Sequence, residues 1–127
     1  MEPGMTHTMS MTVEPQMTAS SMKSGALAVF ATPIMIAMME NVCMECVAPS
    51  LPEGQSTVGT LVNVTHEAPT PVGAEVRFSC TLREVDRRRL VFDVVAEDGM
   101  GVIGRGIHER FIVDSEKFEQ KCRERGM

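Results

Sequence analysis

The sequence predicts an α+β fold in which an antiparallel sheet of about five strands wraps around one central apolar helix. Two observations carry this prediction. Residues 32–48 have a helical pattern that is apolar on nearly every side, and a helix of that kind must be enclosed. Residues 57–113 then alternate between apolar and polar side chains, which is typical of antiparallel strands with one buried face.

The central helix has clear start and stop signals. Thr32 can cap its amino end, and Pro33 suits its first position, where the missing N–H group is not needed. Pro49 then stops the helix. The apolar residues of this segment leave almost no polar side: Ile34, Met35, Ile36, Ala37, Met38, Met39, Val42, Cys43, Met44, Cys46 and Val47. A sheet, or a sheet together with a partner subunit, is therefore expected to cover it.

Four antiparallel strands are expected within residues 57–113. One face of the first strand is predicted to carry Val58, Val62, Val64 and His66. The alternation is most regular over residues 74–83, and two further strands follow at 90–96 and 102–113. Glycines at the start of the last strand, among them Gly104, predict a bulge or a close approach by the helix.

The two ends of the chain complete the expected order. Residues 1–25 are interpreted as a strand, from Thr6 to Val13, followed by a loop from Thr18 to Gly25. At the other end, Ser115 is expected to cap a short charged helix over residues 115–125. The 127 residues are enough for one domain. A single antiparallel sheet folded around one apolar helix is the hotdog architecture, whose exposed edge and half-covered helix favour dimerisation.

Composition disfavours several classes of function. The net charge is −5 and aromatic residues make up 4% of the chain, which speaks against a nucleic-acid partner. No segment approaches the roughly 20 apolar residues of a membrane span. The amino terminus has no basic start followed by an apolar run. We therefore expect no secretory signal and a cytoplasmic location.

The four cysteines are interpreted mainly as packing residues. Cys43 and Cys46 lie in the apolar helical pattern and Cys80 lies on the apolar face of a strand, as expected for reduced, buried thiols. The CMEC spacing resembles that of a zinc site, but no second such pair and no paired histidines accompany it. We therefore expect no metal and no cofactor.

Glu40 is the carboxylate that stands out. Its neighbours one helical turn away are Ile36, Ala37, Cys43 and Met44, so its side chain is either partly buried or faces a cleft. Burial of an unpaired carboxylate is costly, and such a position favours a general base or a nucleophile toward a carbonyl carbon. A carboxylate paired with an arginine at a dimer interface is the structural alternative.

Two further residues could support chemistry at such a carboxylate. His66 ends the inward face of its strand, where a lone histidine is more often structural, but opposite a buried glutamate it could supply a proton to a departing thiolate. Thr32 is fully explained as a helix cap. The start of a helix nevertheless presents free N–H groups and a positive dipole end, which would stabilise the oxyanion formed when a thioester is attacked.

Arginines offer candidate phosphate ligands. Arg110, in the tripeptide HER, could hold a CoA phosphate, pair with an acidic group or brace the active site, and a surface salt bridge is an equal alternative. The run from Arg87 to Arg89 is interpreted as a solvated hairpin loop, with phosphate binding as the weaker alternative.

Three segments with joint spacing resemble the fluoroacetyl-CoA thioesterase family of hotdog enzymes. They are VFATPIMIAMMENVCMECVAP, GTLVNVTHEAPTPVG and GRGIHERFIV, and the similarity runs from about Val29 to Phe118. The resemblance implies an acyl-CoA substrate and a homodimer, or a dimer of dimers, with active sites near the subunit interface.

The resemblance also implies roles for particular residues. Thr32, Glu40 and His66 correspond to the catalytic residues of the family, and Gly59 and Arg110 to residues that contact the substrate. In the family, the glutamate is thought to attack the thioester directly or to activate water, with the threonine and histidine in support.

One departure from the family affects the expected substrate. The fluoroacetyl-specific member has an aromatic lid in a longer connection before the helix, whereas this chain has TASSMKSGALAVF, with Phe30 as the only aromatic residue. We therefore expect an enzyme that hydrolyses another short-chain acyl-CoA to CoA and the free acid. A hydratase or dehydratase of the same fold and a non-catalytic acyl-CoA or small-ligand binding protein are the alternatives.

Overall fold

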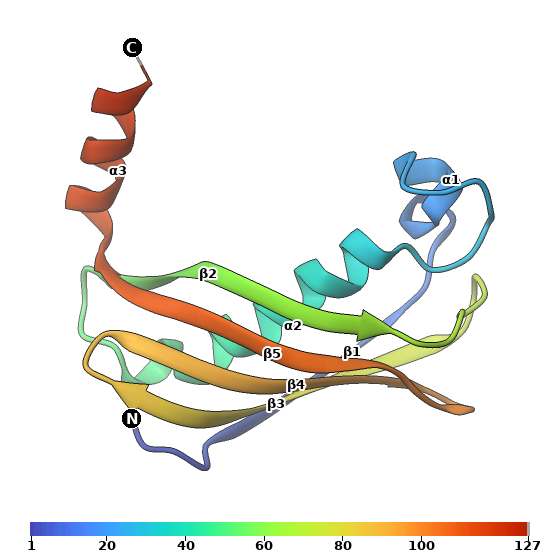
Figure 1. Ribbon diagram of the computed structural model, residues 1–127, viewed down its shortest axis with the longest axis horizontal. Coiled ribbons are helices and arrows are strands. Elements are labelled where there is room, and N and C mark those ends of the chain that lie inside the picture. Colours follow the sequence, from blue (N-terminus) through green and yellow to red (C-terminus); the bar gives the residue numbers. More distant parts are fainter. Residues whose placement is uncertain (127) are drawn as a thin grey trace.

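The computed structural model describes residues 1–126 and has the predicted α+β architecture (Figure 1). Five antiparallel strands form one sheet in the order β1-β3-β4-β5-β2, and the sheet curves around α2. The elements are β1 (Thr6–Thr12), the 3-10 turn η1 (Pro15–Met17), α1 (Ala19–Met22), α2 (Thr32–Val47), the 3-10 turn η2 (Ala48–Ser50), β2 (Gln55–His66), β3 (Glu75–Asp86), β4 (Arg89–Asp98), β5 (Gly101–Asp114) and α3 (Ser115–Arg125). Within residues 1–126, no helix is long and apolar enough to cross a membrane.

The amino end of α2 differs from the sequence prediction. Ala31, not Thr32, is the N-cap; Thr32 is the first helical residue, and no side chain caps the helix. Pro33 still lies within the first turn, where it displaces no helical hydrogen bond. The consequence is that the Thr32 hydroxyl is not engaged in capping and bonds to a side chain outside the helix.

The core lies between α2 and the concave face of the sheet. From the helix, the buried side chains are Met35, Met39, Val42, Cys43, Cys46 and Val47. The sheet contributes Val76, Phe78, Cys80, Leu82, Leu90, Phe92, Val94, Ala96 and Ile103. Gly104 allows α2 to approach closely, because a Cβ atom there would lie 2.7 Å from the Met35 sulfur. The opposite side of α2, with Ala37 and Met44, is exposed in the single chain.

A bulge in β2 corrects the predicted assignment of its faces. The pairing with β5 steps from Gly59 opposite Arg110 to Leu61 opposite Glu109, which leaves Thr60 as an extra residue. Directly paired residues share a face, so Val58, opposite Phe111, lies on the outer face. Val62, Val64 and His66 lie on the helix side, and they are joined there by Thr57 and Gly59, which the simple alternation placed outside.

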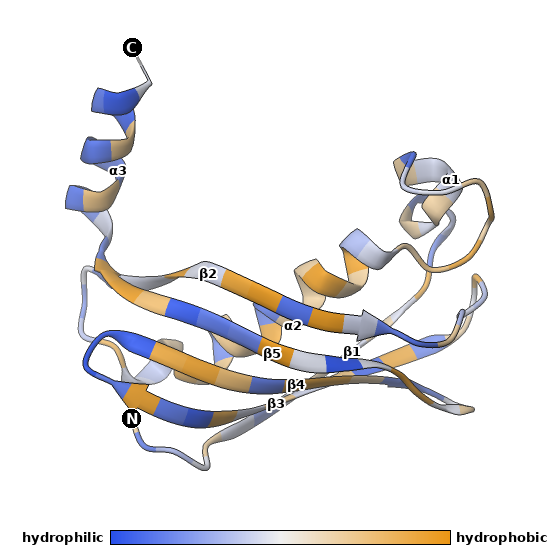
Figure 2. Cartoon of the chain, in the orientation of Figure 1, coloured by the Kyte–Doolittle hydropathy of each residue, from blue (hydrophilic) through white to orange (hydrophobic). Residues whose placement is uncertain are grey.

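The ends of the chain show two smaller differences. The predicted loop at 18–25 contains the short helix α1, whose first turn is capped by the Thr18 hydroxyl. The cap of α3 is Asp114, which accepts a hydrogen bond from the Lys117 N–H, whereas Ser115 bonds to Ser56. Figure 2 shows that α3 is mostly hydrophilic and stands away from the sheet.

Candidate active site

Thr32 and His66 form a hydrogen-bonded pair at the amino end of α2. The Thr32 Oγ1 and His66 Nδ1 atoms are 2.7 Å apart. The other ring nitrogen, Nε2, is buried and has no hydrogen-bond partner among the described residues. The pair lines a hollow of about 260 Å³ together with Phe30, Glu67 and Pro69. A buried imidazole nitrogen without a hydrogen-bond partner is uncommon in folded proteins and marks this hollow as a candidate site.

Glu40 lies two turns further along α2, beside Gly59 and Arg110. The Glu40 side chain is 40% exposed, and its Oε2 is 3.9 Å from Arg110 Nη1. Together with Ala37, Asn41 and Met44, Glu40 and Arg110 line a second hollow of about 240 Å³. The carboxylate thus faces a cleft, which was one of the two environments expected for it.

Arg110 is buried and held by two residues that the sequence analysis did not select. Its Nε donates to Thr57 Oγ1 at 2.8 Å, and its Nη2 donates to the Thr57 carbonyl at 2.9 Å. Its Nη1 lies 3.1 Å from His108 Nε2. Arg110 therefore braces the site from within and does not offer its charge to a surface phosphate. The alternation of His108 and Arg110 along β5 was the available signal, but the bulge hid that Thr57 faces them.

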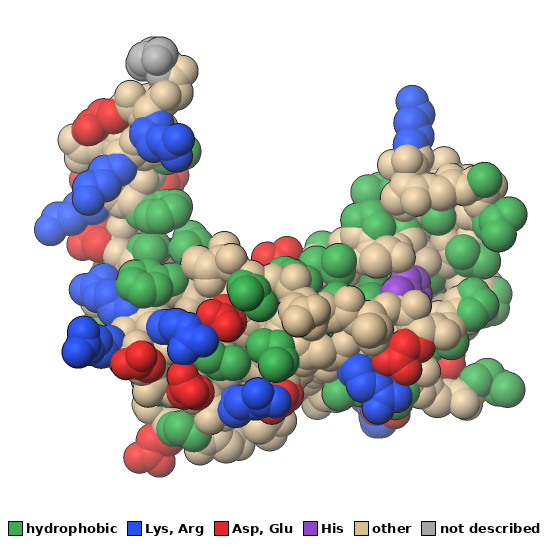
Figure 3. Space-filling view, in the orientation of Figure 1, with side chains coloured by type: hydrophobic (Ala, Val, Ile, Leu, Met, Phe, Trp, Pro, Cys, Tyr) green, Lys and Arg blue, Asp and Glu red, His purple; other side chains and the backbone are tan. Residues whose placement is uncertain are grey.

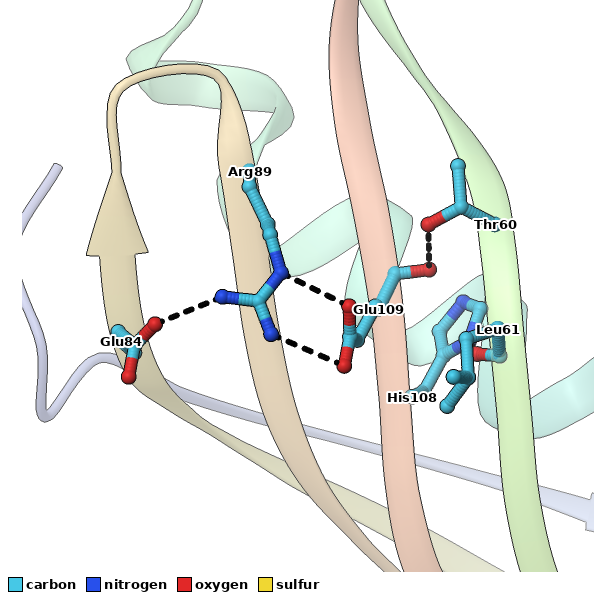
Figure 4. Close-up of polar contacts among 6 residues, drawn as sticks. All are labelled: Thr60, Leu61, Glu84, Arg89, His108 and Glu109. Atoms are coloured by element: carbon cyan, nitrogen blue, oxygen red, sulfur yellow. Dashed lines mark hydrogen bonds and ion pairs between the residues drawn. The ribbon is translucent and has the colours of Figure 1, made fainter.

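Arg89, from the other group of candidate arginines, forms ion pairs on the outer surface. Arg89 donates to both carboxylate oxygens of Glu109, at 2.9 and 3.1 Å, and to Glu84 at 2.8 Å (Figure 4). These pairs lie on exposed strands, where each ion pair contributes little. This arrangement agrees with a solvated hairpin and does not favour phosphate binding by Arg89.

The cysteines take the positions expected for packing residues. Cys43, Cys46 and Cys80 are buried and Cys122 is exposed, all as free thiols. Burial raises the pKa of Cys46 to about 12, so this thiol stays protonated at neutral pH. No group of three or more His, Cys, Asp or Glu side chains within residues 1–126 is arranged to hold a metal ion.

The five candidate residues fall into two groups in the single chain. Thr32 and His66 line one hollow, whereas Glu40 and Arg110 line another and Gly59 lies beside Glu40. Glu40 lies eight positions after Thr32 on α2, which corresponds to roughly 12 Å along the helix axis. The structure brings the members of each group together but leaves the two groups apart in the single chain.

We expect Gly59→Ala to fold normally and to lose activity. A Cβ atom at this position would lie 2.6 Å from Glu40 Oε2, a flexible carboxylate that can move aside, and 3.2 Å from His108 Cε1, a contact that a shift of a few tenths of an ångström relieves. Displacing the carboxylate should lower kcat by roughly tenfold to a hundredfold, with the melting temperature nearly unchanged. Steady-state kinetics and thermal melts check this. Gly104→Ala is the contrasting variant, because its Cβ would lie 2.6 Å from the Thr65 carbonyl, which cannot move, and it should lose stability.

The chain should also lose stability below about pH 6.5, the ordinary pKa of histidine. Burial lowers the pKa of His66, and burial and the nearby Arg110 charge lower the pKa of His108. Each imidazole therefore takes up a proton at a lower pH in the folded chain than in the unfolded chain, so the free energy of unfolding falls as the pH falls. Urea denaturation between pH 7.5 and 5.5 measures this, and a midpoint that stays constant or rises would contradict it.

Comparison with known proteins places this chain in a family. The model of the fluoroacetyl-CoA-specific thioesterase family matches residues 13–116. A fluoroacetyl-CoA thioesterase from Streptantibioticus cattleyicolor is 44% identical over 97 residues, which cover 76% of this chain and 70% of that protein.

Solved structures agree over nearly the whole chain. A structure of a fluoroacetyl-CoA thioesterase superposes with a TM-score of 0.93 at 38% identity, covering 98% of this chain and 96% of that one. A thioesterase superfamily member from Thermus thermophilus superposes with a TM-score of 0.89 at 28% identity, covering 97% of this chain and 91% of that one.

The fold and the matched family therefore define a thioester hydrolase with the hotdog fold. Within that class, the chain belongs to the fluoroacetyl-CoA-specific thioesterase family. The predicted fold class, enzyme class and family resemblance are confirmed.

Proposed function

We propose that this chain, acting as a single hotdog domain, hydrolyses a short-chain acyl-CoA to CoA and the free acid, with Glu40 as the essential carboxylate. The observation that carries the proposal is the position of Glu40, which is held beside Arg110 and Gly59 and faces a hollow. At neutral pH a carboxylate in this setting can attack the thioester carbonyl or accept a proton from an attacking water.

Thr32 and His66 act at the departing thiol. If the Thr32 hydroxyl donates to His66 Nδ1, the neutral imidazole carries its proton on Nε2, the atom without a partner among the described residues. When the C–S bond breaks, this proton passes to the CoA thiolate. The positive end of the α2 dipole lies beside Thr32 and stabilises the carbonyl oxygen as it gains negative charge.

The proposal includes a homodimer that joins the two hollows. β2 is an edge strand, and at its centre Leu61 and Val62 are 43% and 40% exposed. The apolar side of α2 next to it, with Ala37 and Met44, is also exposed. Figure 3 shows that α3 and the α1 region rise at opposite ends of the molecule and leave the surface over β2 hollowed. A second copy placed on this edge would cover both features.

The proposal also includes a cytoplasmic location, which the free, mostly buried thiols support.

The expected acyl group is short and need not be fluorinated. Phe30 is 1% exposed and packs with its ring 6.4 Å from those of His66 and Phe78, so it is a core residue and does not cover the opening of a cleft. A chain without an aromatic lid has little means to separate fluoroacetyl from acetyl esters.

A series of acyl-CoA esters tests the substrate class. Thiol release is measured for acetyl, fluoroacetyl, propionyl, isobutyryl, hexanoyl and benzoyl esters. We expect the highest kcat/KM among the short aliphatic esters, and a difference between acetyl and fluoroacetyl below about tenfold. A strong preference for fluoroacetyl would contradict the proposed substrate class. Binding of the esters without thiol release would favour the non-catalytic alternative.

A further inference from the structure

The buried imidazole of His108 connects Arg110 to the edge strand β2. His108 is 1% exposed, its Nδ1 lies 2.8 Å from the Leu61 carbonyl oxygen, and its Nε2 lies 3.1 Å from Arg110 Nη1. Figure 4 shows His108 beside Leu61 of β2, while Glu109 points away from it toward Arg89. On the outer face, the ion pair of Arg89 with Glu109 joins β4 to β5 next to His108.

The partners of His108 fix its protonation state. A carbonyl oxygen only accepts hydrogen bonds, so Nδ1 must carry the proton that is shared with Leu61. A guanidinium group only donates, so Nε2 must present its lone pair to Arg110. The neutral Nδ1–H tautomer is the one form that satisfies both contacts. A doubly protonated imidazole would direct an N–H group at a cation.

Arg110 is held on three sides, and its contact with His108 is made by the nitrogen that faces Glu40. Thr57 binds the Nε and Nη2 atoms, and His108 binds Nη1. That same Nη1 is the guanidinium atom 3.9 Å from Glu40 Oε2. Any rotation of the guanidinium about its Thr57 contacts would therefore change the position of the positive charge relative to the Glu40 carboxylate.

We propose that His108 is a positioning residue for Glu40. The neutral imidazole of His108 holds Arg110 Nη1 toward the Glu40 carboxylate. This inference rests on the proposed function of Glu40. His108 acts through Arg110 and does not itself contact the substrate. The charged groups around its ring are Arg110 on β5 and Glu40 on α2, with Glu109 on the far side of β5. The ring also stacks on Phe92 of β4, with centroids 6.5 Å apart.

Paired substitutions separate positioning from packing. His108→Leu removes the acceptor for Arg110 and should lower kcat by about tenfold to a hundredfold, with KM changed less than about threefold. His108→Gln keeps an amide oxygen that can accept from Arg110, so it should recover most of the lost kcat. Phe92→Leu removes the stacked ring but leaves both polar contacts; it should lower the melting temperature and leave kcat within about twofold. A wild-type kcat in His108→Leu, or an equal loss in Phe92→Leu, would overturn the proposal.

Nitrogen NMR of the imidazole gives a readout that does not depend on turnover or on any variant folding. We expect His108 of the wild-type chain to show a protonated Nδ1 and an unprotonated Nε2 at pH 7. The Nε2–H tautomer or an imidazolium would overturn the inference, because neither can accept from Arg110. If the wild-type chain hydrolyses no ester of the series, the proposed function fails on its own, while the tautomer still decides whether His108 holds Arg110.

Discussion

Replacing Glu40 with glutamine is expected to lower thioester hydrolysis by about a thousandfold or more while acyl-CoA binding survives. Glutamine keeps the size of the side chain and can still accept hydrogen bonds, so the cleft and the neighbouring Arg110 should keep their positions. It removes the negative charge, and an amide neither attacks a thioester readily nor takes a proton from water. Steady-state measurement of thiol release gives the rate of hydrolysis, and calorimetric titration with the same ester gives the binding affinity.

A charge-matched control lies on the same helix. Glu45→Gln removes a carboxylate from the exposed side of α2 near its carboxyl end. It should change kcat less than about twofold. Hydrolysis by Glu40→Gln at a rate close to that of the wild-type chain would show that another group attacks the thioester or activates water.

Placing lysines at both Leu61 and Val62 is expected to convert a dimer into monomers and to remove most of the activity. These adjacent residues lie on opposite faces of the β2 edge, so the two lysines would obstruct a second copy on either face. In a symmetric pairing of two β2 strands, the lysines of both copies would also lie close together and repel one another. Since neither hollow alone contains all the candidate residues, monomers should hydrolyse acyl-CoA at least about a hundredfold more slowly.

Light scattering coupled to size-exclusion chromatography measures the mass, and thiol release measures the activity. The control is the double variant Val72→Lys with Met100→Lys, which adds the same charge at apolar residues that are exposed away from the β2 edge. The control should remain a dimer with wild-type kcat. A wild-type chain that is monomeric and fully active would contradict the proposed dimer, and so would a double variant at the edge that remains dimeric.

The architecture could be predicted because its two main signals are strong and local. The apolar pattern of α2 and the regular alternation of β3 each require burial. The structure buries the sheet-facing side of α2 and alternate residues of β3, whereas the other side of α2 stays exposed in the single chain. The helix start was assigned one residue too late, with Thr32 as the cap and not the first helical residue, because Thr and Pro are common at both positions.

The details of the candidate site depended on features that alternation cannot show. One extra residue at Thr60 reverses the faces of β2, which moved Val58 outward and brought Thr57 and Gly59 to the helix side. Sequence alone does not distinguish His108, because its contacts with the Leu61 carbonyl and the Arg110 guanidinium form only when β2 pairs with β5. Glu40 could be selected from the sequence, since a carboxylate among apolar helical residues is unusual whichever residues of the folded chain lie beside it.

The most direct test of the central claim is a time course of thiol release from short acyl-CoA esters by the wild-type chain, with the free acid quantified in the same samples. The account predicts many equivalents of CoA per chain, an equal amount of acid, and loss of both products in Glu40→Gln. Esters that bind without releasing thiol, or release that continues unchanged when Glu40 is replaced, would contradict it.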